Sequence, residues 1–141
     1  MMASLEGDAI VLRAVEYGES DVIAHLLMPE QGRLTVIAKH ARKSRRRFPG
    51  SLDLFNHLSV RISIKHRSSL GFLEQAVLRA PFLELRHRAA RYALASYLVE
   101  LLDRMAPEQG AEADMGRIFE FALSALEAIG GVEPDDRLRT F

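Results

Sequence analysis

The chain has 141 residues, of which 48% are hydrophobic, enough for one domain of ordinary size or a small domain with part of a second. It contains no cysteine, which excludes a disulfide framework and a cysteine zinc site. The amino terminus lacks a basic region before an apolar run, and no run of about 20 apolar residues follows. We therefore expect a soluble, cytoplasmic protein with no membrane partner.

The formal net charge is zero, but the two parts of the chain carry opposite charge. Residues 1–80 hold 12 Lys and Arg against 8 Asp and Glu, whereas residues 81–141 hold 7 against 11. This split predicts a module for binding polyanions over residues 1–80, joined to a neutral or acidic support over residues 81–141.

The first 80 residues alternate mainly with a period of two. His57–Lys65 is the clearest strand, with its apolar side chains on one face and Arg61 and Lys65 on the other. Four further strands are predicted at Ala9–Tyr17, Val22–Met28, Leu34–Ala38 and Phe72–Leu78. Short links, among them 17–21 and 29–32 with Gly32 at positive φ, predict a five-stranded antiparallel sheet that closes into a barrel.

After Pro81 the period changes to that of a helix. A helix is predicted over His87–Met105, and its apolar stripe, with Tyr97 beside it, is expected to be core: Ala90, Leu94, Leu98, Leu101 and Met105. A second helix is predicted from an N-cap at Asp114 to Ile129, with these core residues: Ile118, Phe119, Ala122, Leu126 and Ile129. A third helix opens within residues 133–141, so we expect an α+β chain whose helical domain, 81–141, is incomplete or needs a partner.

The long connection between the third and fourth strands carries six cations within nine positions: Lys39, Arg42, Lys43, Arg45, Arg46 and Arg47. Clustered Lys and Arg bind a phosphate backbone by releasing its counterions, although many charge runs are only solvated surface. Mutual repulsion between the cations favours phosphate binding. Phe48 either stacks on a base or pins the loop to the barrel, and Arg61, Lys65 and Arg67 are expected to extend the groove.

The sequence offers little support for catalysis. The five histidines show no HExxH spacing, and neither a nucleophile elbow nor a phosphate-binding glycine loop is present. Glu19 and Asp21 have the chemistry of metal ligands, but a turn between strands uses the same residue types. We therefore expect no enzyme activity, no cofactor and no metal.

The sequence resembles the RecO family of bacterial recombination mediators. The resemblance is carried by "AIVLRAVEYGESDVIAHLLMPEQGRLTVIAKHARKS" from Ala9 to Ser44, by "SLDLFNHLSV" and by "YLVELLDRM". His40 stands where the family usually has Gly, and family members continue for roughly another hundred residues.

The resemblance implies an oligonucleotide-binding (OB) barrel over residues 1–80 and a non-enzymatic role in DNA repair and recombination at the bacterial nucleoid. Such a protein binds single- and double-stranded DNA, anneals strands and, with RecR and sometimes RecF, helps RecA replace single-strand binding protein. The DNA-binding residues are then expected to be the following: Lys39, His40, Arg42, Lys43, Arg45, Arg46, Arg47, Phe48, Arg61, Lys65 and Arg67.

Two other functions remain open at the level of sequence. In one, the protein is an adaptor that binds other proteins through its acidic helices and basic loop, without contacting nucleic acid. In the other, it is a metal-dependent nuclease that uses Glu19 and Asp21.

Overall fold

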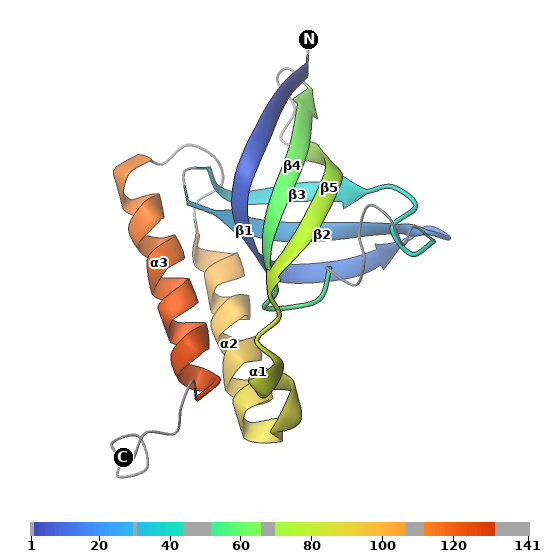
Figure 1. The fold of residues 1–141 in the computed structure, drawn as a ribbon. Coiled ribbons are helices and arrows are strands. Elements are labelled where there is room, and N and C mark those ends of the chain that lie inside the picture. Colours follow the sequence, from blue (N-terminus) through green and yellow to red (C-terminus); the bar gives the residue numbers. More distant parts are fainter. Residues whose placement is uncertain (1, 30, 44–51, 66–69, 107–111, 132–141) are drawn as a thin grey trace.

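Five strands close into a barrel in the order β1-β2-β3-β5-β4, and helices follow it along the chain (Figure 1). The computed structural model describes residues 2–29, 31–43, 52–65, 70–106 and 112–131. The elements are β1 (Met2–Tyr17), β2 (Asp21–Met28), β3 (Gly32–Ala38), β4 (His57–Lys65), β5 (Leu70–Ala80), α1 (Leu83–His87), α2 (Ala89–Met105) and α3 (Glu112–Ile129).

One pair of neighbouring strands is parallel, so the expectation of a purely antiparallel sheet is wrong. β3 and β5 pair in parallel from Thr35 opposite Leu70 to Ile37 opposite Phe72, and the other four neighbouring pairs are antiparallel. Strand directions cannot alternate all the way around a ring with an odd number of strands. A closed barrel of five strands therefore needs a parallel joint.

β1 begins at Met2, seven residues before the predicted start. Its first half pairs with β4 and its second half pairs with β2, and the register shifts between Val11 and Arg13. Residues 4–8 include Gly and acidic residues, which have low strand propensity. Pairing with β4 extends this strand, and the local sequence does not predict it.

The barrel interior is formed by alternate side chains, as predicted for β4. Leu58, Val60 and Ile62 are buried and Arg61 is exposed. The buried residues of this first core are these: Ala9, Val11, Ala24, Leu26, Met28, Leu34, Val36, Ala38, Leu58, Val60, Ile62, Leu73 and Ala76.

A second core joins the outside of the barrel to the helices. Ile10, Leu12 and Leu27 of the barrel pack in one cluster with side chains of α1, α2 and α3. Phe55, which is fully buried, belongs to this cluster, and its ring lies 5.5 Å from that of Tyr92 in an edge-to-face arrangement. The helices therefore share a core with the barrel, and the division into domains at residue 80 stays a prediction.

The buried face of α2 is not the predicted one. The residues of α2 that are buried against the barrel are Ala95, Val99 and Asp103. Of the predicted stripe only Leu98 is partly buried, and the following are exposed: Ala90, Leu94, Tyr97, Leu101 and Met105. Small Ala and Val side chains let the helix axis approach the barrel closely, so the bulkier apolar side chains face outward.

α3 confirms the predicted core face, since Phe119, Ala122 and Leu126 are buried and Ile118 and Ile129 pack against them. Its start is at Glu112, so Asp114 lies inside the first turn and is not the N-cap. The predicted third helix lies outside the described residues. Within the described ranges, no helix is both long and apolar enough to span a membrane.

Candidate nucleic-acid interface

The turn between β1 and β2 is the platform on which the candidate site is built. Tyr17 pairs with Asp21 across the hairpin, and Gly18 takes a φ of 63°, a conformation that glycine adopts without strain. Ser20 is buried beneath the turn. The hairpin projects from the barrel on the side away from the helices (Figure 1).

Residues 39–43, here called the basic turn, fold back onto this hairpin. The backbone amide of His40 donates to Oδ1 of Asp21 at 2.8 Å, and the backbone amide of Arg42 donates to the carbonyl of Ser20 at 2.9 Å. The amide of Lys43 donates to the carbonyl of His40 at 3.0 Å and closes the turn. The first part of the long connection is therefore held against the hairpin at defined points.

His40 anchors the basic turn. Its φ is 60°, in the left-handed region that disfavours residues with a Cβ, and its Nδ1 lies 3.3 Å from Oγ of Ser20. The bond from its amide to Asp21 helps to hold this conformation. A histidine thus occupies the backbone conformation that a glycine would adopt without strain, and the contact of His40 with DNA stays a prediction.

Arg42 is tied to the same hairpin by its side chain. One terminal nitrogen donates to the carbonyl of Glu19 at 3.0 Å, and Nε lies 3.5 Å from Oε1 of Glu16. The side chain of Arg42 remains 41% exposed and that of Glu16 is 71% exposed. Exposed ion pairs contribute about 0–1 kcal/mol, so a phosphate can displace Glu16 at small cost. Lys39 and Lys43 are exposed on either side.

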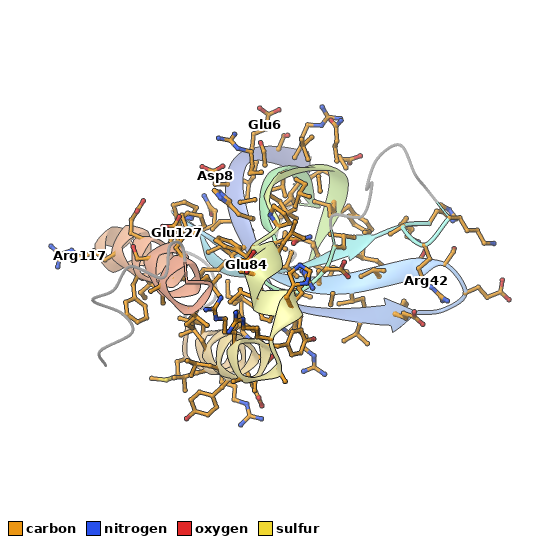
Figure 2. The ribbon with its side chains drawn as sticks, turned by 60° about the horizontal axis from the view of Figure 1, so that its bottom comes forward. Glu6, Asp8, Arg42, Glu84, Arg117 and Glu127 are labelled. Atoms are coloured by element: carbon orange, nitrogen blue, oxygen red, sulfur yellow. The ribbon has the colours of Figure 1, made fainter. Side chains whose placement is uncertain are left out.

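The structure brings together only part of the predicted DNA-binding set. Lys39, His40, Arg42 and Lys43 share the basic turn, whereas Arg61 lies on β4 opposite Glu6 of β1 and Gln75 of β5. Figure 2 shows Glu6 and Arg42 on different sides of the barrel. Five predicted residues, together with the side chain of Lys65, lie outside the described part: Arg45, Arg46, Arg47, Phe48 and Arg67.

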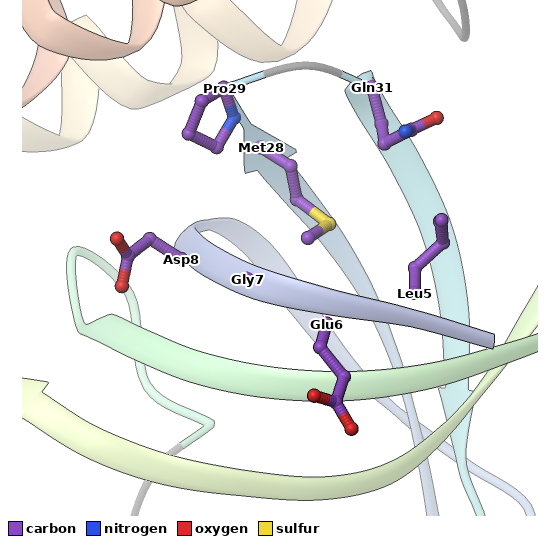
Figure 3. A pocket seen from close by; sticks show the side chains of 7 residues that line it. All are labelled: Leu5, Glu6, Gly7, Asp8, Met28, Pro29 and Gln31. Carbon is purple, nitrogen blue, oxygen red and sulfur yellow. The ribbon is translucent and has the colours of Figure 1, made fainter.

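A small hollow of about 270 Å³ between β1 and the β2–β3 turn is a poor phosphate site (Figure 3). Met28 and Leu5 line it, together with the backbone of Gly7 and the acidic residues Glu6 and Asp8. Figure 3 shows both carboxylates turned away from Met28. Negative charge at the rim opposes the approach of a polyanion, so this side of the barrel is not the candidate interface.

A polar cluster that the sequence did not suggest ties the barrel to α2. Oδ1 of Asp103 lies 2.7 Å from Nδ1 of His25 on β2 and 3.4 Å from a guanidinium nitrogen of Arg33 on β3. The same Arg33 nitrogen donates to the backbone carbonyl of Asp103 at 2.7 Å. No spacing in the sequence predicts this cluster, because its members come from three elements up to 78 residues apart.

Glu19 and Asp21, the alternative metal ligands, serve the basic turn in this structure. Glu19 accepts a bond through its backbone carbonyl and Asp21 through its carboxylate. Among the residues the structure describes, no three His, Asp or Glu side chains lie close enough to hold a metal ion.

The closed five-stranded barrel, with its parallel β3–β5 joint and a basic turn beside its first hairpin, defines a protein with an OB-type barrel followed by helices. The chain belongs to the RecO family, because residues 2–82 match the family described as Recombination protein O N terminal.

Curated relatives agree with this assignment. The chain is similar to the DNA repair protein RecO of Desulfosudis oleivorans, with 35% identity over 90% of this chain and 49% of that protein. It is 37% identical to the same-named protein of Myxococcus xanthus over 90% of this chain and 52% of that protein. The protein of Geobacter sulfurreducens is 35% identical over 96% of this chain and 55% of its own length. The chain thus spans about half the length of these relatives.

Proposed function

We propose that the chain is a non-enzymatic DNA-binding protein of DNA repair and recombination, and that the basic turn is its phosphate contact. The observation that carries this proposal is the anchoring of the basic turn by Asp21, Ser20 and Glu19 on the β1–β2 hairpin. Anchoring lowers the entropy that the turn must lose on binding, so more of the electrostatic attraction remains as affinity.

The binding mechanism is the replacement of condensed counterions by protein cations. Lys39 and Lys43 are exposed, and Arg42 exchanges its weak pair with Glu16 for a phosphate. Arg45, Arg46 and Arg47 follow directly in the sequence and add to the same positive potential. Such a contact gives affinity for DNA without a preference for sequence.

The finer role that we propose rests on the family resemblance. By neutralising phosphates on two strands, the protein would lower their repulsion and promote annealing. Together with RecR and RecF it would assist RecA in replacing single-strand binding protein on single-stranded DNA in the bacterial cytoplasm. Relatives named DNA repair protein RecO support this role.

Two triple variants with the same change in charge test DNA binding. In one, Lys39, Arg42 and Lys43 are replaced by Gln, and in the control, the exposed residues Arg79, Arg88 and Arg117 are replaced by Gln. Anisotropy titration of a labelled single strand at several salt concentrations should show that the first variant loses affinity and about 2 units of the log–log salt slope, from 0.7 per phosphate contact. Equal loss in both variants would mean that only net charge matters, and the proposal would fail.

One observation favours the adaptor as a second candidate. α2 exposes Leu94, Tyr97 and Met105, with exposed fractions of 55%, 65% and 70%. An adaptor without a nucleic-acid role predicts that the chain has no measurable affinity for oligonucleotides at low salt, with or without the basic turn. The same titration therefore separates the two candidates.

A further inference from the structure

A groove of about 700 Å³ lies between the second half of β1 and the carboxy-terminal half of α2. β1 contributes Leu12 to Val15, while α2 contributes Ser96, Val99, Glu100, Asp103 and Arg104. His25 and Arg33 line it from β2 and β3. The volume is in the range of sites that hold small molecules or short polymer segments.

The charges in this groove are unequal in their exposure. The carboxylate of Asp103 is only 11% exposed and is already contacted by His25 and Arg33. The accessible charges are therefore Arg13, which is exposed, and the pair of Arg104 with Glu100, whose side chains are 75% and 60% exposed and 2.8 Å apart. A pair this exposed contributes little, so Arg104 can turn to an incoming anion.

The groove also offers a polar atom that has no protein partner. Oγ of Ser96 is buried, and it makes no hydrogen bond with any residue in the described ranges. A buried hydroxyl normally finds a partner, and a phosphate oxygen at this wall of the groove would accept from it.

β1 connects this groove to the basic turn. Side chains at alternate positions of a strand share a face, and Arg13, Val15 and Tyr17 are exposed, with fractions of 46% for Val15 and 55% for Tyr17. Tyr17 ends the strand beside the hairpin turn to which the basic turn is bonded. From Arg13 to Tyr17 the strand covers about 13 Å, at roughly 3.3 Å per residue.

We propose that a single DNA strand runs from the basic turn along this face of β1 into the groove against α2. Tyr17 provides a ring for base stacking, Val15 an apolar contact, and Arg13 and Arg104 hold phosphates at the entrance of the groove. α2 forms the second wall, which admits one strand and obstructs a duplex. This inference rests on the proposed function and adds α2 to its binding surface.

Single substitutions of opposite sign test the electrostatic part. Arg13→Gln should weaken binding of a single strand about fivefold and lower the salt slope by about 0.7, since one phosphate contact is lost. Glu100→Gln should strengthen binding, because it removes the exposed anion of the groove. Arg117→Gln is the control, since Arg117 is exposed on α3 at the far end of the molecule from Arg42 (Figure 2). Equal affinities for the Arg13 and Arg117 variants would overturn the proposal.

The absence of cysteine allows a second test that does not depend on affinity. Val15→Cys and Phe121→Cys each place one thiol at an exposed position, on β1 and on α3 respectively. Labelled with an environment-sensitive dye, the first should respond to a saturating single strand and the second should not. If DNA binds through the basic turn while the two dyes respond equally, the groove is excluded and the proposed function stands. If no DNA binds at all, both fail.

Discussion

Asp103 of α2 accepts a hydrogen bond from Nδ1 of His25 on β2 across 2.7 Å, and thereby fixes the helix against the outer face of the barrel. Arg33 of β3 completes the contact through the carboxylate and the backbone carbonyl of Asp103. The carboxylate sits among partners from two strands, so its position depends on a correctly formed barrel. This relationship couples the groove against α2 to the barrel itself.

Replacing Asp103 by Asn should destabilise the protein by about 1–3 kcal/mol. The variant leaves the guanidinium of Arg33, whose side chain is 19% exposed, without its countercharge. Urea unfolding followed by circular dichroism measures the change, with Glu100→Gln on the same helix as a control that should lie within about 0.5 kcal/mol of the parent. Equal stability of the two variants would show that the cluster does not hold α2 in place.

Phe55 should be the side chain whose loss costs most. It is fully buried, touches Tyr92 edge-to-face, and has Arg86 5.6 Å from its ring centroid. Phe55→Ala should lower the free energy of unfolding by about 3–5 kcal/mol. Phe121→Ala, which changes the same residue type at a position 59% exposed, is the matched control and should have a small effect. A comparable loss in both would contradict the shared core.

The left-handed conformation of His40 predicts an unusual order of stabilities. At a φ of 60°, alanine pays the strain of a Cβ without keeping the contact to Ser20, whereas glycine pays no strain. His40→Gly should therefore be more stable than His40→Ala by about 1 kcal/mol, as measured by thermal unfolding of the two variants. At an ordinary helical or extended position the order would be reversed or the difference absent.

Glu16 should act as a competitor of DNA for Arg42. Its carboxylate lies 3.5 Å from Nε of Arg42, so Glu16→Gln frees the guanidinium and removes a repelling charge. We expect affinity for a single strand to rise about twofold to threefold at low salt, with the gain shrinking as salt screens the interaction. Glu120→Gln, at an exposed position of α3, is the control and should leave the affinity unchanged.

The extent to which sequence predicts this structure depends on whether the signal is local. β4 is predicted from its bounds to its buried face, because alternation over residues 57–65 is carried by the strand itself. The first half of β1 is not predicted, because it depends on pairing with β4, more than 50 residues away. α2 misleads for another reason: its bulky apolar residues are exposed and its small ones are buried.

The same distinction holds for the site. A run of cations between Lys39 and Arg47 is visible in the sequence and identifies the basic segment. The anchoring of that segment is not visible, because Asp21, Ser20 and Glu19 belong to a hairpin that closes near it only in the folded barrel. Arg61 shares the residue type of the basic turn but not its place, since sequence carries no direct record of which face a strand turns to which side of a barrel.

The salt dependence of single-strand binding tests the central claim most directly. The parent protein should show a log–log slope of about −4 if all six cations between Lys39 and Arg47 meet phosphates, and the variant with all six replaced by Gln should show a slope near zero and greatly reduced affinity. An unchanged slope and affinity in that variant would contradict the account.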